Sequence, residues 1–221
     1  MNKKEFTLYD KIINYLMIKS FCMRNNGIHH GRMALALTIY HYGFYTKNHV
    51  LVDFSVNLLD SILEDEKNIQ TPILNFTNGR IGIGWGMEYL LFKLTEINYN
   101  EILRQYLTYI DNRVKEYFLN DSFPPPPDYS IDVGILHYVL IRNSGCQKRN
   151  ELQPYPSSFV KGLCRKCSSV SKKEYNQYFM VDSYIIDIKT IYPLLCVQNE
   201  EFETSLTDGF PNVLLRYLKI I

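Results

Sequence analysis

Two short glycine-centred phrases recur along the chain and limit what it can fold into. The first is GIHHGRMALA, residues 27–36, and the second is NGRIGIGWG, residues 78–86. Their Gly-Arg pairs begin at Gly31 and Gly79, which are 48 positions apart (79 − 31), and a weaker third copy surrounds Gly134. A period of about 50 residues with small residues opening each unit is typical of stacked helical hairpins.

Hydrophobic periodicity supports this interpretation. Each glycine phrase is followed by a stretch that is apolar nearly all round and then by one with an apolar stripe and a charged face. We therefore expect a buried inner helix paired with an amphipathic outer helix in each unit, and an all-α fold. The expected helices are an opening helix that stops near Asn25, and residues 33–45, 50–64, 82–94, 101–118 and 131–141.

The later part of the chain departs from this pattern. Residues 123–128, FPPPPD, predict a stiff non-helical connector because each proline removes a backbone donor. Residues 144–173 show no clear period and predict an irregular loop or insert. Helices are expected again near residues 175–195 and 212–220. The predicted organisation is one domain, with helical repeats over 1–143, the insert over 144–173, and C-terminal helices over 174–221 that pack on the same domain.

Composition excludes several classes of function. Lys and Arg number 24 against 23 Asp and Glu, a formal charge of +1, so no global field draws the chain to nucleic acid. No run reaches about 18 consecutive apolar residues, and the N-terminus does not resemble a secretory signal, so we expect a cytoplasmic protein without a membrane span. Five scattered cysteines do not form a secreted disulfide framework, and we expect them to be reduced.

One cysteine pair has the spacing of half a zinc site. Cys164 and Cys167 enclose two basic residues that favour thiolates, but no second Cys-x-x-Cys follows. We expect unreactive cysteines here, with a metal site or a redox pair as the alternatives, and we expect the chain to carry no metal or other cofactor.

The glycine phrases resemble those of a known family. Residues 27–34 fit Gly-x-x-His-Gly-x-x-small, and residues 78–90 read like the following repeat. Over roughly residues 1–140 the chain resembles the lanthionine synthetase C-like (LanC-like) proteins, which cyclise ribosomally made peptides. The resemblance implies an incomplete α/α toroid of inner and outer helices and a role in peptide maturation.

The zinc ligands of that family are absent from this sequence. The family holds zinc with a cysteine in a Trp-Cys-Tyr-Gly-like phrase and with an adjacent Cys-His pair, and the metal activates a substrate thiol. No cysteine here precedes a histidine, and the one tryptophan, Trp85, precedes Gly86. The resemblance therefore implies a protein without the cyclase reaction, which binds a precursor peptide or a modifying enzyme.

We predict a binding surface at the mouths of the first two inner helices. It contains His30, Arg32, Arg80, Trp85 and Glu88. Arg32 and Arg80 occupy equivalent repeat positions, and exposed guanidinium groups that face a shared central cavity there would bind a carboxylate or an acidic peptide. Each residue also has a structural interpretation: a capping histidine, arginines paired with neighbouring acids, and a tryptophan packed in the core.

Two other functions stay open at this point. Toroids of α-hairpins also host carbohydrate-active or other hydrolases that use paired carboxylates, for which Glu88 and Asp132 are the candidates, although they form no obvious pair. The chain could also be a plain protein–protein interaction subunit. The sequence leaves its oligomeric state open.

Overall fold

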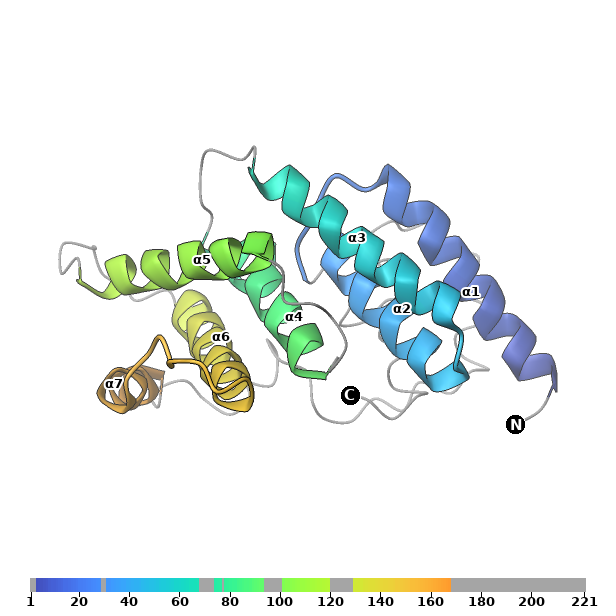
Figure 1. Ribbon diagram of the computed structural model, residues 1–221. Helices are drawn as coiled ribbons and strands as arrows, with labels where there is room; N and C mark the ends of the chain where they lie inside the picture. Colours follow the sequence, from blue (N-terminus) through green and yellow to red (C-terminus); the bar gives the residue numbers. More distant parts are fainter. Residues whose placement is uncertain are drawn as a thin grey trace. The chain divides into compact units, whose positions relative to one another are not determined.

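The computed structural model describes residues 3–28, 31–67, 74–76, 78–93, 101–119 and 129–167 (Figure 1). Within these ranges every regular element is an α-helix, and none is a strand. The all-α class is therefore confirmed, while closure into a toroid stays a prediction. No helix of the described part is both long and apolar enough to cross a membrane.

The described residues form two compact units. The predicted domain organisation of the whole chain stays a prediction. The boundary lies inside one helix, between Ile62 and Leu63. Each unit buries its own apolar side chains, which explains the division: Ile13, Leu16, Met33, Leu35 and Ile39 in the first unit, and Ile81, Ile83, Met87, Leu107 and Ile110 in the second.

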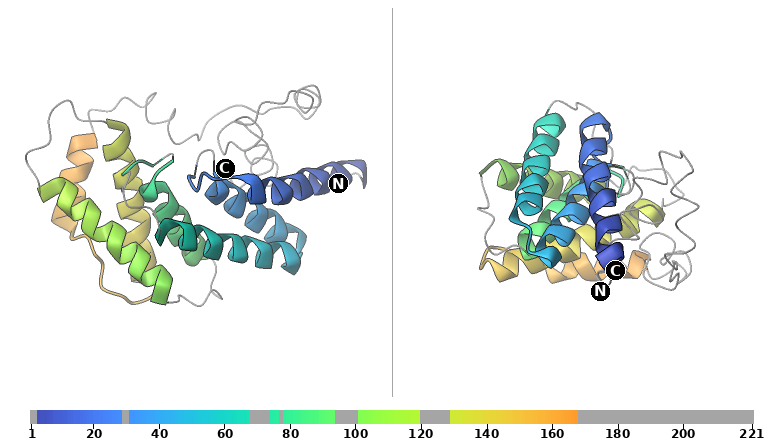
Figure 2. Two further views of the ribbon diagram at one scale, coloured as in Figure 1. Left: turned by 90° about the horizontal axis from the view of Figure 1, so that it is seen from above. Right: turned by 90° about the vertical axis from the view of Figure 1, so that its right-hand side faces the viewer.

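In the first unit, helices α1 (Lys3–Cys22), α2 (Arg32–Thr46) and α3 (His49–Lys67) lie side by side, as the blue to teal ribbons of Figures 1 and 2 show. The turn between α2 and α3 is tight because Lys47 adopts a left-handed conformation with φ 56°. In addition, the Ser55 hydroxyl of α3 donates to the Ala36 carbonyl of α2 at 2.8 Å. Helix α2 is buried from Arg32 to Tyr40, as expected of an inner helix.

The second unit contains α4 (Arg80–Lys93), α5 (Glu101–Leu119), α6 (Tyr129–Lys148) and α7 (Ser157–Cys167). Helix α4 packs on α5 and α6, and α6 packs on α7. Gly84 permits the close approach of α4, because a Cβ there would lie 2.6 Å from Ile110 Cδ1 and 3.0 Å from Tyr138 Cε2. The small residues of the second glycine phrase therefore allow α4 to lie close to its neighbours.

The expected helix positions agree closely with α2, α3, α4 and α5, and α1 ends before Asn25 as predicted. The predicted insert over 144–173 is wrong at residues 144–148, which continue α6, and at residues 157–167, which form α7, whereas residues 149–156 between them are irregular as predicted. Helix α7 has only 11 residues, and Leu163 is its one buried described side chain, so the segment is at the lower limit of length for a helix to be predicted from its pattern. The predicted connector 123–128, residues 168–173 and the predicted helices 175–195 and 212–220 lie outside the described residues.

Candidate functional site

Arg32 begins α2, where its positive charge is disfavoured by the helix dipole and needs an acceptor. The Asn26 side-chain oxygen accepts from Arg32 Nε at 2.8 Å and from Nη2 at 2.6 Å. Arg32 Nη1 also donates to the Ser61 hydroxyl of α3 at 3.0 Å. Arg32 therefore ties the start of α2 to the preceding loop and to α3.

Arg80 begins α4 in the equivalent way but uses different partners. Its Nε lies 3.0 Å from Glu66 Oε2, and its Nη2 donates to the Glu66 main-chain oxygen at 3.0 Å. That oxygen is near the C-terminus of α3, where carbonyls lack helical partners, so Arg80 caps α3. Arg80 Nη1 also donates to the Tyr109 hydroxyl at 2.7 Å.

The expected exposure of these two guanidinium groups is wrong. Arg32 is 7% exposed and Arg80 is 6% exposed. Arg80 instead pairs with a neighbouring acid, Glu66, as the structural interpretation anticipated. Both side chains start at a helix terminus and reach the adjacent helix, which buries them. A cavity shared by the two arginines stays a prediction, because each belongs to a different unit.

A hollow of about 320 Å³ lies beside Arg80 in the second unit, and we call it the Arg80 hollow. It is lined by Leu63, Glu66, Lys67, Arg80, Ile102, Gln105, Tyr106 and Tyr109. Ile102 and Tyr109 are partly exposed, whereas Glu66 is buried. The hollow thus joins apolar and aromatic walls to a buried ion pair and an exposed cation.

Tyr106 contributes a buried hydroxyl to this region. Burial raises the pKa of Tyr106 well above its ordinary value, and the Glu66 carboxylate raises the pKa further. The hydroxyl therefore keeps its proton at physiological pH and can act only as a neutral donor or acceptor.

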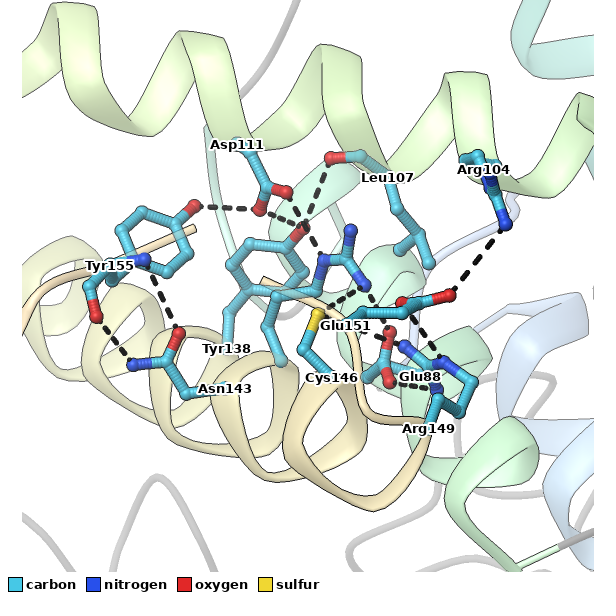
Figure 3. A network of polar contacts seen from close by, with 11 residues as sticks. Glu88, Arg104, Leu107, Asp111, Tyr138, Asn143, Cys146, Arg149, Glu151 and Tyr155 are labelled. Atoms are coloured by element: carbon cyan, nitrogen blue, oxygen red, sulfur yellow. Dashed lines mark hydrogen bonds and ion pairs between the residues drawn. The ribbon is translucent and has the colours of Figure 1, made fainter. Parts of the chain in front are cut away.

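Glu88 lies at the centre of a second polar cluster, which Figure 3 shows between α4, α5 and α6. Its carboxylate is fully buried and lies 3.0 Å from Arg142 Nη1 and 2.6 Å from Arg149 Nη1. Burial raises the pKa of Glu88 above its ordinary value, although both arginines act to lower it. Two guanidinium groups therefore compensate only part of the cost of burying this charge.

Asp111 of α5 is the other buried acid of the cluster. Its Oδ2 lies 3.1 Å from Arg142 Nε, and its Oδ1 accepts from the hydroxyls of Tyr138 at 2.8 Å and Tyr155 at 2.9 Å. Arg142 thus bridges Asp111 and Glu88. At the edge of the cluster, Glu151 Oε2 lies 3.2 Å from Arg149 Nε, and Glu151 Oε1 lies 3.7 Å from Arg104 Nη2. We call these side chains the Glu88 network.

Sequence reasoning identified only Glu88 of this network. Asp111 carried a detectable signal, because it lies four residues after Leu107 and three before Val114 on the apolar stripe of α5, where a charge must find a buried partner. Arg142 lies one helical turn after Tyr138, which is also fully buried. The sequence signal that could have identified the buried charges of this network was therefore a charged residue within an apolar stripe of a helix.

The remaining predicted site residues have separate surroundings. Trp85 is half-buried, stacks on Tyr89 with ring centroids 5.1 Å apart, and meets Phe76 edge-on at 6.0 Å. Trp85 and Glu88 thus have different partners. His30 lies outside the described residues.

The described cysteines differ in exposure. Cys146 is buried, its Sγ lies 3.2 Å from Arg142 Nη1, and burial raises its pKa, which disfavours the reactive thiolate. Cys164 is exposed, and the side chain of Cys167 is outside the described part. Among the side chains that the structure describes, no three of His, Cys, Asp or Glu gather to hold a metal ion. The role of Cys164 and Cys167 stays a prediction.

His137 of α6 gives the second unit an expected pH dependence. Burial lowers its pKa from 6.5 to about 4, so the folded protein binds this proton more weakly than the unfolded chain does. Stability is therefore complete above about pH 6.5 and falls as the pH drops toward 4. We expect a loss of about 2 kcal/mol between pH 7 and pH 5 from this residue, measured by urea unfolding.

The matched variant for this prediction is His137→Gln, which cannot titrate. Its free energy of unfolding should change less between pH 7 and pH 5 than that of the native chain, by about the same 2 kcal/mol. Equal pH dependence in both proteins would show that His137 is protonated without cost in the folded state.

Comparison of the chain with protein-family models, curated proteins and solved structures found no match. The resemblance to LanC-like proteins is therefore carried by the glycine phrases and their spacing.

Proposed function

We propose that the chain is a LanC-like protein of ribosomal peptide maturation that binds a precursor peptide, or the enzyme that modifies it, and performs no chemistry itself. The observation that carries the proposal is the Arg80 hollow, which opens where the second glycine phrase starts α4. The helical hairpins and the Gly-Arg phrase at each inner-helix mouth support the family context.

The size and lining of the hollow suit part of a peptide. Ligand sites start at about 300 Å³ and combine apolar walls with a few polar groups. The Arg80 hollow has about that volume, and its wall includes two tyrosines and an arginine. Tyrosine and arginine are over-represented among residues that carry binding energy at interfaces. One or two peptide side chains would fill it.

The Glu88 network favours binding over hydrolysis. A hydrolase of the paired-carboxylate type needs both acids in contact with the substrate. Glu88 and Asp111 are both buried, and Arg142 bridges them. Neither carboxylate reaches a substrate in this arrangement, and the side chain of Asp132 lies outside the described residues.

Site-directed photo-crosslinking tests the proposal. A benzoylphenylalanine placed at position 102 would sit at the rim of the hollow, because Ile102 is 45% exposed. The probes are short synthetic peptides with a double-glycine leader. We expect a crosslink from position 102 and none from position 152, where Leu152 is 96% exposed and lies outside the hollow.

A second measurement gives the contribution of Tyr109 to the free energy of peptide binding. Tyr109→Ala should weaken peptide binding at least about fivefold in fluorescence anisotropy, since a central tyrosine at an interface is worth more than about 1 kcal/mol. Crosslinking of a folded enzyme but of no peptide would favour the plain interaction subunit. Absence of any crosslink from position 102, or equal labelling from position 152, would refute the proposed binding site.

A further inference from the structure

We infer that the Arg80 hollow selects an acidic peptide segment, in which one large apolar side chain stands next to an aspartate or glutamate. This inference rests on the proposed function and gives the chemistry of its ligand. It follows from the charges, walls and volume of the hollow.

The charges of the hollow leave an excess of one positive charge. Arg80 is compensated by Glu66 at 3.0 Å, and both side chains are buried. Lys67 also lines the hollow and is exposed at its rim. An acidic side chain near Lys67 therefore gains attraction from the rim, whereas a basic one is repelled.

The walls of the hollow supply the apolar part of the specificity. Leu63, Ile102 and the rings of Tyr106 and Tyr109 line it. The Arg80 guanidinium lies 5.0 Å from the centre of the Tyr109 ring, and its Nη1 donates to that residue's hydroxyl, so two contacts fix the ring. An apolar side chain that enters the hollow therefore contacts a surface that is already ordered, so its binding costs little conformational entropy in the protein.

Volume limits the occupant to a short segment. About 320 Å³ holds one large side chain and a neighbouring group, and no folded domain can enter it. The exposed amide of Gln105 at the same site offers both a donor and an acceptor to a peptide backbone. The occupant is thus an extended segment with an apolar anchor and an adjacent acid.

Three synthetic probes test the inference on the full chain. They are fluorescein-labelled hexapeptides of sequence Gly-Ser-Phe-Xaa-Ser-Gly with acetylated and amidated ends, where Xaa is Glu, Gln or Lys. We expect anisotropy titrations in 50 mM NaCl to give about tenfold tighter binding of the Glu probe than of the Lys probe. This ratio should shrink in 500 mM NaCl, because salt screens exposed charges.

Variants of opposite sign assign the preference to the hollow. Lys67→Glu should abolish the preference for the Glu probe, and Glu66→Gln should strengthen it by removing the buried negative charge. Lys161→Glu is the matched control, since Lys161 is exposed on α7 and does not line the hollow. The control should bind all three probes as the native chain does. The melting temperature of Lys161→Glu should equal that of the native chain, whereas that of Lys67→Glu should fall slightly, because the substitution places a negative charge in the last turn of α3.

Three results would contradict the inference, and each concerns a different part of it: charge selection, the apolar anchor or peptide binding. Equal affinity for the three probes, with no effect of Lys67→Glu, would overturn charge selection but leave peptide binding intact. A fourth probe, Gly-Ser-Ser-Glu-Ser-Gly, lacks the phenylalanine, and equal binding of this probe would overturn the apolar anchor. Binding of no probe would overturn the inference, and the crosslink from position 102 would then decide whether the proposed function survives.

Discussion

Replacement of Arg142 by methionine should lower the free energy of unfolding of the second unit by about 3–5 kcal/mol. Arg142 is 5% exposed and contacts Asp111 at 3.1 Å and Glu88 at 3.0 Å. Methionine preserves much of the shape but removes the charge that both buried carboxylates share. Urea unfolding followed by circular dichroism at pH 7 measures the loss.

Two comparisons separate charge from packing in this result. Arg113→Met removes an arginine of the same unit whose partner Glu116 is 54% exposed, and it should cost no more than about 1 kcal/mol. The loss in Arg142→Met should also shrink at pH 4, since protonation neutralises Glu88, whose pKa burial already raises. A loss that is independent of pH would assign Arg142 to packing alone.

The variant could fall below the stability needed to fold, because domains are stable by only about 5–15 kcal/mol. In that case Glu88→Gln, Asp111→Asn and Arg142→Met combined should restore helical circular dichroism, since no buried charge then lacks its partner. A combined variant that stays unfolded would contradict our electrostatic explanation of the network.

The helices were predictable because their signals are local. Helix α2 has apolar or small residues throughout its first turns, and α5 repeats apolar residues at helical spacing from Leu103 to Val114. The Gly-Arg phrases marked the starts of α2 and α4 correctly. Such patterns depend only on residues within a few turns of one another, so one sequence suffices to find them.

The partners of the charged residues were not predictable in this way. Arg142 follows Asp111 by 31 positions, which matches no helical or hairpin period. It follows Glu88 by 54 positions, close to the repeat of about 50 residues, but a repeat relates equivalent positions and does not predict that their side chains pair. The boundary between the two units, after Ile62, was not predictable either, because it lies inside the regular helix α3. Tertiary packing decides both features, and the sequence carries only the indirect signal of a charge within an apolar stripe.

The two Gly-Arg phrases repeat a structural task with different partners. Arg32 binds the side chains of Asn26 and Ser61, whereas Arg80 binds Glu66 and Tyr109. Both arginines anchor the start of an inner helix to α3. Repeat equivalence therefore indicated where the anchors lie, but not that their guanidinium groups are buried.

The substitution Gly145→Ala should destabilise the second unit by about 3 kcal/mol. A Cβ at this position would clash with Glu88 Oε1, which cannot move without breaking its contact with Arg149 Nη1 at 2.6 Å. In contrast, Gly162→Ala on α7 meets nothing within 4 Å and should stabilise by about 0.5–1 kcal/mol, because alanine favours helices. Thermal or urea unfolding of the two variants should show opposite signs.

A double-mutant cycle identifies Glu88 as the source of the clash. Glu88→Ala alone should cost about 3–5 kcal/mol, since it leaves Arg142 and Arg149 without their shared carboxylate. Addition of Gly145→Ala to Glu88→Ala should then cost nothing further, because the atom that the Cβ would strike is gone. The costs of the two changes would thus be strongly non-additive. Additive costs would instead mean that the Gly145 Cβ clashes with another neighbour, of which Arg149 Nη1, at 3.1 Å, is the nearest candidate outside Glu88.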